Sequence, residues 1–455
     1  MESFINRREM LKRSGLGCGM LALHSLMAES TAQASAIPSH FPAKAKNVIW
    51  LFMHGGPSQM DTFDPKPLLN DLHGKKAPAS FHDIQTSFTD VKKQKLLGSD
   101  FTFSRCGQSG MEISDGFKYM QRHADDIAVI RSLHHKDFNH NPALWFMNSG
   151  HNKGGRPSMG SWLSYGLGSE ANNLPGFVVM TDGAMKAGSG VWGNGFLPAT
   201  HQGTKLSASG PPIPNLEQSM ESEKQLKMLN YIRQLDSGTH PELEARIKSY
   251  ELAFRMQMAA PEALDIANES KATLELYGKN VFSRQCLMAR RLVERGVRMV
   301  QIYNGCSSGN EWDTHHHNNS RHKKLLRNVD QGCAALLADL KARGMLEDTL
   351  VIWCGEFGRT PTTEKSSGRD HNPYGFCGWM AGGGVQGGQV IGATDEIGFR
   401  AVEDKVHVHD FHSTILKLMG LDHEALSVRH KGLDLRLTDL HGYHDIYDRL
   451  TGRKV

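Results

Sequence analysis

The sequence has 455 residues, of which 39% are hydrophobic and 22% are charged, and its formal net charge is +4 at pH 7. This composition is typical of a globular protein with a substantial core. The small charge, and the lack of basic runs interleaved with aromatic residues, argue against nucleic acid as a partner. Histidine is enriched, at 24 residues, with clusters at His134-His135 and His315-His316-His317. Clustered imidazoles favour a bound metal ion.

The N-terminus has the pattern of an export signal. Arg7-Arg8 lies in a stretch, NRREMLK, that resembles the twin-arginine export motif, and a weakly apolar segment from Gly15 to Ala28 follows. Ala32-Gln33-Ala34 offers a cleavage site, so we expect a signal peptide over 1–34 and a mature domain over 35–455. The apolar segment is too short to span a membrane stably. The sequence therefore predicts a periplasmic or cell-envelope protein without an integral membrane span in its mature chain; the alternative is an ordinary basic amphipathic N-terminus.

Strand and helix patterns alternate along the mature chain. In chain order we expect a strand at 48–53, a strand at 126–132, a helix at 159–167, a strand at 176–181, a helical insertion at about 215–279, a helix at 286–295, a strand at 297–303, a helix with its apolar face at 329–340, strands at 349–354 and 376–381, and a final helix near 411–419. This order predicts an α/β fold with a largely parallel central sheet and helices on both faces.

The cysteines beyond the signal show no pairing framework. They form no C-x-x-C motif, and several lie inside apolar runs, as Cys333 and Cys354 do, where we expect free buried thiols. Their positions are 106, 286, 306, 333, 354 and 377.

Polar residues stand where the expected strands end. His54 closes the first strand, ahead of Gly55-Gly56-Pro57. Because the carboxyl ends of parallel strands meet at one edge of a sheet, residues far apart in the sequence converge there. Side chains of His, Asp and Glu at such an edge can bind one or two divalent ions. The other residues at expected strand ends or starts are Asp313, Glu356, Arg359, Asp370 and His371.

Each of these positions has a structural alternative. EWDTHHHN could form a solvated turn, Glu356 could pair with Arg359 on the surface, and Asp370-His371, which we expect in a loop, could belong to a turn at Asn372-Pro373. His54 could simply bond to the turn that it precedes. A phosphate-binding loop is not indicated, because Pro57 removes an amide donor and AGGGVQGGQVIG lacks the Lys-Ser/Thr of such loops.

Six motifs together resemble the DUF1501 family of the alkaline phosphatase-like superfamily. They are HGGPSQMDTFDPKP, SLHH with NHNPALWFMNSG, EWDTHHHN, GEFGRTP, GRDHNPYGF and RHKGLDLRLTDLHG, and they cover nearly the whole mature chain. The resemblance implies a three-layer fold and a metal centre. The metal ligands that it implies are His54, in place of a superfamily Asp, Asp313 with His315 or His317, Glu356, and Asp370-His371.

The same resemblance places the superfamily nucleophile near His140, where no hydroxyl stands. A sulfatase signature is also absent, because Cys286-Leu-Met-Ala-Arg290 lacks its proline. We therefore expect hydrolysis of a phosphate or sulfate ester through metal-bound hydroxide, with His140 as ligand, general base or nucleophile and Arg359 holding the anionic oxygens. The cofactor would be one or more divalent ions, zinc first, with manganese or iron as alternatives.

Two other functions remain open at this point. A non-catalytic envelope protein could keep the metal centre for structure or bind an anionic glycan, which the missing hydroxyl favours. An isomerase or mutase acting on phosphorylated substrates is disfavoured by the missing nucleophile and by the expected export. The expected partner is a small-molecule or glycan ester, and the sequence leaves the oligomeric state open.

Overall fold

The computed structural model describes residues 39–207, 222–235, 241–307, 311–365, 367–438 and 444–452. The expected signal peptide lies outside these residues. Within the described ranges, no helix combines the length and the apolar character needed to cross a membrane.

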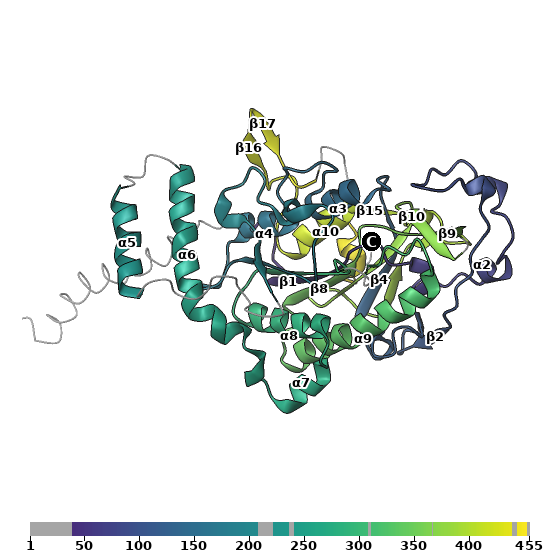
Figure 1. Cartoon of the computed structure of the whole chain (residues 1–455), viewed down its shortest axis with the longest axis horizontal. Helices are drawn as coiled ribbons and strands as arrows, with labels where there is room; N and C mark the ends of the chain where they lie inside the picture. Colours follow the sequence, from purple (N-terminus) through teal and green to yellow (C-terminus); the bar gives the residue numbers. More distant parts are fainter. Residues whose placement is uncertain are drawn as a thin grey trace, which may run out of the picture.

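A nine-stranded sheet forms the centre of the protein (Figure 1). Its main path runs β12-β4-β11-β8-β1-β7-β5-β6, and β15 pairs with β4. Every strand pairing in this described sheet is parallel except those of β11 with β8 and β4. The strands are β1 (Asn47–Met53), β4 (Ile127–His134), β5 (Phe177–Thr181), β6 (Thr204–Leu206), β7 (Met299–Asn304), β8 (Thr349–Cys354), β11 (Phe376–Ala381), β12 (Gln389–Ile391) and β15 (Val406–His407).

Strand β1 lies in the middle of the sheet because both of its faces are apolar. It pairs with β7 on one side and with β8 on the other, and every one of its residues is buried. Ile49 and Leu51 point into one core cluster, whereas Trp50 and Phe52 point into the other. A strand covered on both faces requires such a continuous apolar run.

Helices cover both faces of the sheet, which confirms the predicted layers (Figure 1). One face carries α3 (His140–Ser149), α4 (Met159–Leu167) and α10 (Val408–Leu418). The opposite face carries α7 (Lys271–Tyr277), α8 (Val281–Glu294) and α9 (Asn318–Ala342). The apolar side chains of each set pack with alternate residues of the central strands.

The expected helical insertion contains α5 (Ser222–Leu235) and α6 (Pro241–Leu264), which pack together and project from the body at the left of Figure 1. Residues 208–221 and 236–240 of this region lie outside the described residues. Arg290 of α8 is buried, with Nη2 2.8 Å from Oε2 of Glu269 and Nε 2.9 Å from Oδ2 of Asp339. These ion pairs join the segment before α7 to α8 and α9.

The structure corrects the expectation that Asp370 and His371 lie in a loop. They belong to β10 (Gly368–Asn372), which forms an antiparallel hairpin with β9 (Gly358–Glu364). Both strands are polar in sequence yet buried. Because β11 runs against its neighbours, its beginning lies at the edge where the parallel strands end, and β10 precedes it there.

Several predicted boundaries also shift. Helix α8 begins at Val281 rather than at 286, α9 begins at Asn318, and α10 is followed by α11 (Tyr447–Leu450). A short helix, α2 (Pro67–Asp71), precedes three small antiparallel strand pairs outside the central sheet. These pairs are β2 (Phe103–Cys106) with β3 (Met111–Ser114), β13 (Ala393–Thr394) with β14 (Ala401–Glu403), and β16 (Val428–His430) with β17 (Leu433–Leu435). The 3₁₀ helices are η1 (Gln59–Asp61), η2 (Ala79–Phe81), η3 (Val91–Lys93), η4 (Met120–His123), η5 (Gly188–Trp192), η6 (Ala199–His201) and η7 (Ile266–Asn268).

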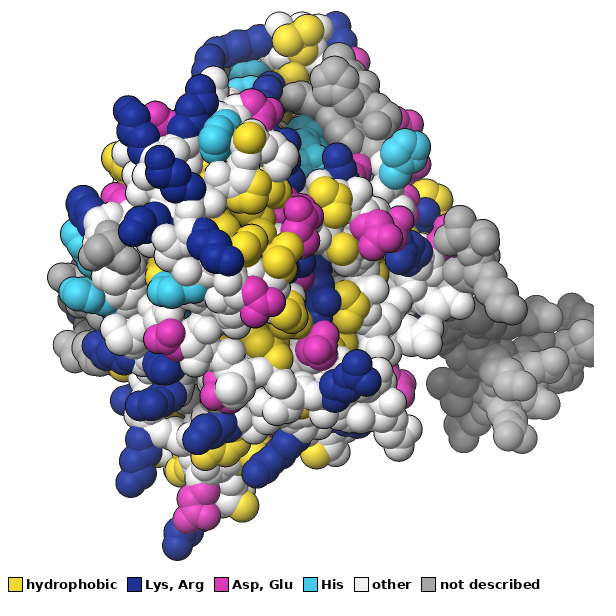
Figure 2. Space-filling view, turned by 90° about the vertical axis from the view of Figure 1, so that its right-hand side faces the viewer, with side chains coloured by type: hydrophobic (Ala, Val, Ile, Leu, Met, Phe, Trp, Pro, Cys, Tyr) yellow, Lys and Arg dark blue, Asp and Glu magenta, His cyan; other side chains and the backbone are white. Residues whose placement is uncertain are grey.

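The cysteines at 106, 286, 306, 333, 354 and 377 are all free and buried, which confirms the prediction for Cys333 and Cys354. On the face shown in Figure 2, basic and acidic side chains are interspersed and neither sign covers the surface alone. This mixture agrees with the small net charge.

Candidate metal centre

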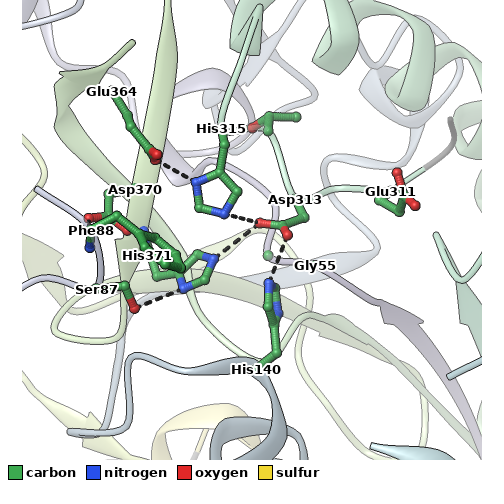
Figure 3. A network of polar contacts seen from close by, with 12 residues as sticks. Gly55, Ser87, Phe88, His140, Glu311, Asp313, His315, Glu364, Asp370 and His371 are labelled. Carbon is green, nitrogen blue, oxygen red and sulfur yellow. Dashed lines mark hydrogen bonds and ion pairs between the residues drawn. The ribbon is translucent and has the colours of Figure 1, made fainter. Parts of the chain in front are cut away.

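Four side chains converge at the edge of the sheet where the parallel strands end (Figure 3). His140 is the first residue of α3, Asp313 and His315 lie between β7 and α9, and His371 lies on β10. Each of the four offers one ligand atom, and these atoms all lie within 4.8 Å of one another. The cluster therefore joins three histidines and one carboxylate from three separate parts of the chain.

The three imidazoles point the same ring atom at Asp313. Nε2 of His140 lies 3.0 Å from Oδ2 of Asp313, while Nε2 of His315 and Nε2 of His371 lie 2.8 and 3.1 Å from Oδ1. The carboxylate of Asp313 is thus the centre of the cluster, as Figure 3 shows.

The opposite ring atom of each histidine meets an acceptor outside the cluster. Nδ1 of His140 lies 2.7 Å from Oε1 of Glu356, Nδ1 of His315 lies 2.5 Å from Oε2 of Glu364, and Nδ1 of His371 lies 2.7 Å from the carbonyl oxygen of Phe138. With a metal ion bound, each neutral ring would carry its proton on Nδ1. The lone pair of Nε2 would then face inward, which is the arrangement that metal-binding histidines adopt.

Burial and neighbouring charges shift the pKa values of the cluster residues. Burial acts to raise the pKa of Asp313, but Arg359 and the hydrogen bonds from the three histidines outweigh it and hold that pKa well below its usual range. Burial acts to lower the pKa of His140, yet hydrogen bonds to Asp313 and Glu356 raise it. Burial lowers the pKa of His371 to about 4 despite its bond to Asp313. The centre thus keeps a carboxylate and favours positive charge beside it.

Glu356 lies outside this cluster of four. Its side chain is fully buried, and besides His140 it accepts hydrogen bonds of 2.9 and 3.0 Å from the backbone N–H of Gly55. Burial acts to raise its pKa, but the bond to His140 and the neighbouring histidines lower it to about 2. The alternative of a surface ion pair between Glu356 and Arg359 does not apply, because both side chains are buried and have other partners.

Arg359 is oriented toward Asp313 rather than toward solvent. Its guanidinium donates to the carbonyls of Gly55, of Gly56 at 3.0 Å and of Arg369 at 3.2 Å, and to Oδ1 of Asp313 at 2.7 Å. These four bonds occupy most of the five donors of an arginine. Arg359 therefore holds the carboxylate of Asp313 in place.

Lys186 is the cation that the sequence reasoning missed. It lies beyond the end of β5, with Nζ 2.7 Å from Oδ2 of Asp313 and a side chain that is 37% exposed. A search for charged residues after each expected strand would have found it, because β5 is the neighbour of β7 in the sheet.

His54 stands behind His140. Its side chain is buried, Nδ1 lies 3.2 Å from the carbonyl oxygen of Gly305, and the two histidine rings stack at a centroid distance of 6.1 Å. Burial lowers the pKa of His54. Its Nε2 has no hydrogen-bond partner among the described residues.

Two other predicted ligands have different surroundings. His317 is exposed and contacts Ser367, and it is not among the four residues of the cluster. Oδ2 of Asp370 accepts three hydrogen bonds from Phe88 and Thr89, and Oδ1 accepts the N–H of His371. Asp370 also forms a second group with His315 and Glu364, whose ligand atoms lie within 4.8 Å of one another. In that group, Nδ1 of His315 and Oε2 of Glu364 are already in contact at 2.5 Å.

Gly55 and Gly56 allow the close packing of this region. Their φ angles are 116° and 88°, in the left-handed range that favours glycine. A Cβ on Gly55 would lie 2.6 Å from the backbone nitrogen of Asp313, and one on Gly56 would lie 2.7 Å from the ring of Phe357. The glycine pair therefore brings the end of β1 against the segment that carries the central carboxylate.

Solved structures that are similar to this chain include several hydrolases and a synthase. The lipoteichoic acid synthase LtaP from Listeria monocytogenes has 9% identity and a TM-score of 0.39, with 88% of this chain and 77% of that chain covered. The PsFucS1 sulfatase from Pseudoalteromonas sp. has 13% identity and a TM-score of 0.37, with 88% and 71% covered. The phosphonate monoester hydrolase SpPMH from Silicibacter pomeroyi has 11% identity and a TM-score of 0.38, with 90% and 77% covered.

Among curated proteins none matches the chain. A protein family described as "Protein of unknown function (DUF1501)" matches residues 45–448. This match covers most of the 455 residues and agrees with the motifs that run through the mature chain. The chain therefore belongs to the DUF1501 family.

Proposed function

We propose that this protein is an exported, metal-dependent hydrolase of a phosphate or sulfate ester. One observation carries the proposal: the Nε2 atoms of His140, His315 and His371 lie 2.8–3.1 Å from the carboxylate of Asp313, while each Nδ1 is held by an outer acceptor. Each ring lies between two acceptors, so a neutral ring turns a lone pair toward one of them, and a cation among the three Nε2 atoms would relieve that repulsion.

The donor set fits a divalent ion. Three imidazole nitrogens and one carboxylate oxygen suit zinc, and the same mixture of N and O ligands also suits manganese or iron. His140, Asp313, His315 and His371 would hold the ion. The unpartnered buried Nε2 of His54 marks a further polar position behind His140 that a water or a second ion could satisfy.

A bound ion would supply Lewis acidity, which stabilises negative charge and lowers the pKa of water to roughly 7. The chain itself would do the positioning. Glu356 and Glu364 fix two of the imidazoles, and Arg359 fixes Asp313. Lys186, exposed beside Oδ2 of Asp313, is the residue that we propose for holding the anionic oxygens of the ester, a role first expected for Arg359.

The proposed route uses no serine nucleophile. Helix α3 begins with His140, which lies in the cluster itself. The hydroxyl of Ser87 lies 3.2 Å from Nδ1 of His371, on the outer side of that ring, and donates to the carbonyl of Phe138 at 2.7 Å. It is therefore not directed at the face where the four ligand atoms meet.

The second candidate is a non-catalytic envelope protein in which the centre stabilises the fold or binds an anionic glycan. The lack of a hydroxyl at the start of α3 favours it. In that case the protein would bind metal, lose stability on chelation, and turn over no ester.

The decisive experiment is metal analysis of the purified protein and of three single variants. His315→Ala should lose most of the bound metal, and His316→Ala and His317→Ala, in the same histidine triplet but exposed, should retain it. Metal-loaded protein is then assayed with aryl phosphate, phosphodiester and aryl sulfate substrates. Wild type without a divalent ion, or equal loss in all three variants, would reject the site; metal without turnover would select the second candidate.

We also propose that export follows the twin-arginine pathway. The support is the NRREMLK stretch, which lies outside the described residues. Replacing Arg7 and Arg8 by lysine should keep the protein in the cytoplasm, as fractionation of expressing cells would show. Unchanged export of that variant would reject the proposed pathway.

A further inference from the structure

Phe88 stands at the metal centre with its side chain in solvent. It is 66% exposed, the largest exposed fraction among the large hydrophobic side chains of the described residues. Its ring meets the rings of two cluster histidines nearly at right angles, with centroids 5.1 Å from His315 and 5.7 Å from His371. Figure 3 shows it beside these two rings.

The backbone that carries Phe88 is firmly held. Oδ2 of Asp370 accepts the N–H groups of Phe88 at 2.8 Å and Thr89 at 3.0 Å, and also the hydroxyl of Thr89 at 3.0 Å. The hydroxyl of Thr86 donates to the carbonyl of Thr89 at 2.6 Å, and that of Ser87 donates to the carbonyl of Phe138 at 2.7 Å. A buried carboxylate thus fixes the segment 86–89 against the centre.

An apolar ring in water forgoes the stabilisation that burial would give it. A single exposed aromatic residue is ordinary on a protein surface. Phe88 differs because it touches two of the histidines proposed as metal ligands and because its loop is tied to the strand that carries His371. Its position therefore gives one side of the centre an apolar wall.

Lys186 adds a positive charge at the same cluster. Phe88 lies against the histidines that contact Oδ1 of Asp313, whereas Lys186 contacts Oδ2. A ligand at the cluster would therefore have both an ammonium group and an aromatic ring among its neighbours. Such a pair matches an ester whose anionic group is attached to a flat ring.

We propose that Phe88 is a specificity-determining residue on which a ring of the substrate, aryl or sugar, packs next to the ester group. This inference rests on the proposed function and names the substrate class: ring-bearing phosphate or sulfate esters. Aromatic contacts of this kind correspond to roughly a three- to tenfold gain in affinity.

Binding of non-hydrolysable probes tests the inference without any turnover. Calorimetry measures the dissociation constants of two probe series on metal-loaded wild type, Phe88→Ala and Phe88→Trp. The phosphonates are phenylphosphonate, cyclohexylphosphonate and methylphosphonate, and the sulfonates are benzenesulfonate and methanesulfonate. Metal content is measured in each preparation. The phenyl and cyclohexyl probes distinguish an aryl ring from a saturated, sugar-like ring.

We expect wild type to favour a ring-bearing probe over its methyl counterpart by roughly three- to tenfold. Phe88→Ala should bring this ratio close to one, and Phe88→Trp should keep it, with equal metal content in all three proteins. A ratio near one in wild type, or an unchanged ratio in Phe88→Ala, would overturn the inference and leave the proposed function standing. Failure of every probe to bind, or absence of metal from wild type, would overturn both.

Discussion

Nδ1 of His140 lies 2.7 Å from Oε1 of the fully buried Glu356, and these two residues are 216 positions apart in the sequence. The same carboxylate accepts the N–H of Gly55 at the end of β1. One buried acid therefore connects the central strand, the start of α3 and the orientation of a cluster histidine.

Replacing Glu356 by glutamine should weaken metal binding by about 10- to 100-fold, the usual effect of losing an outer partner of a ligand histidine. The amide oxygen can still accept the N–H of Gly55, but its NH₂ group then faces Nδ1 of His140 and favours the wrong tautomer. Competition with a chromophoric chelator measures the affinity. Wild-type affinity in this variant would show that Glu356 does not set the orientation of His140.

Gly55→Ala should remove metal binding by displacing Asp313. The new Cβ would lie 2.6 Å from the backbone nitrogen of Asp313, at a φ of 116° that alanine rarely adopts. Gly344→Ala is the matched control, because its φ is also positive, at 69°, but nothing lies within 4 Å of the new Cβ. Metal content should fall only in the first variant; an equal loss in both would point to general destabilisation.

Arg359→Lys should lower the free energy of unfolding by about 2–4 kcal/mol, because a single ammonium cannot replace the bonds to three carbonyls and Asp313. Chemical denaturation of the protein measures the loss. Arg429→Lys, which alters an exposed pair with Asp434, should change the free energy by less than about 0.5 kcal/mol. A similarly small effect at Arg359 would contradict the supporting role assigned to it.

Stability should fall in mild acid partly because of His412. Burial lowers the pKa of this histidine in the folded protein to about 3, and its Nε2 donates to the carbonyl of Met147 at 2.8 Å. Between an unfolded pKa near roughly 6.5 and the folded value, only the unfolded state binds the proton, so folding stability decreases as pH falls through this window.

His412→Gln should therefore reduce the slope of unfolding free energy against pH by about 1 kcal/mol per pH unit between roughly pH 6 and 4. Denaturant titrations at several pH values give the slope. The exposed His316 supplies the control, because His316→Gln should leave the slope as it is in wild type. Parallel profiles for wild type and His412→Gln would show that His412 does not contribute.

The layered fold follows from patterns that are local in the sequence. Apolar runs such as 48–53 and 349–354 predict strands buried on both faces, and both strands form as expected. The polar β9–β10 hairpin carries no such pattern. Its burial is accommodated because Arg359 and Arg369 contact carboxylate and carbonyl groups from distant segments. Such contacts cannot be predicted from the local sequence.

Polar residues after apolar runs predict that His54, Asp313 and Glu356 gather at one edge, since parallel strands end together. The sequence also predicts His371 at this edge, but His371 lies there because the antiparallel β11 begins there, which a parallel strand order does not give. Which of these residues meet depends on contacts between segments that are far apart in the sequence. The orientation of each imidazole depends on the acceptor behind it. Glu356, Glu364 and the carbonyl of Phe138 hold Nδ1 of His140, His315 and His371, so that Nε2 of each ring faces Asp313. The same distances bring His315 rather than His317 to the centre, add Lys186 and place Phe88 at its rim.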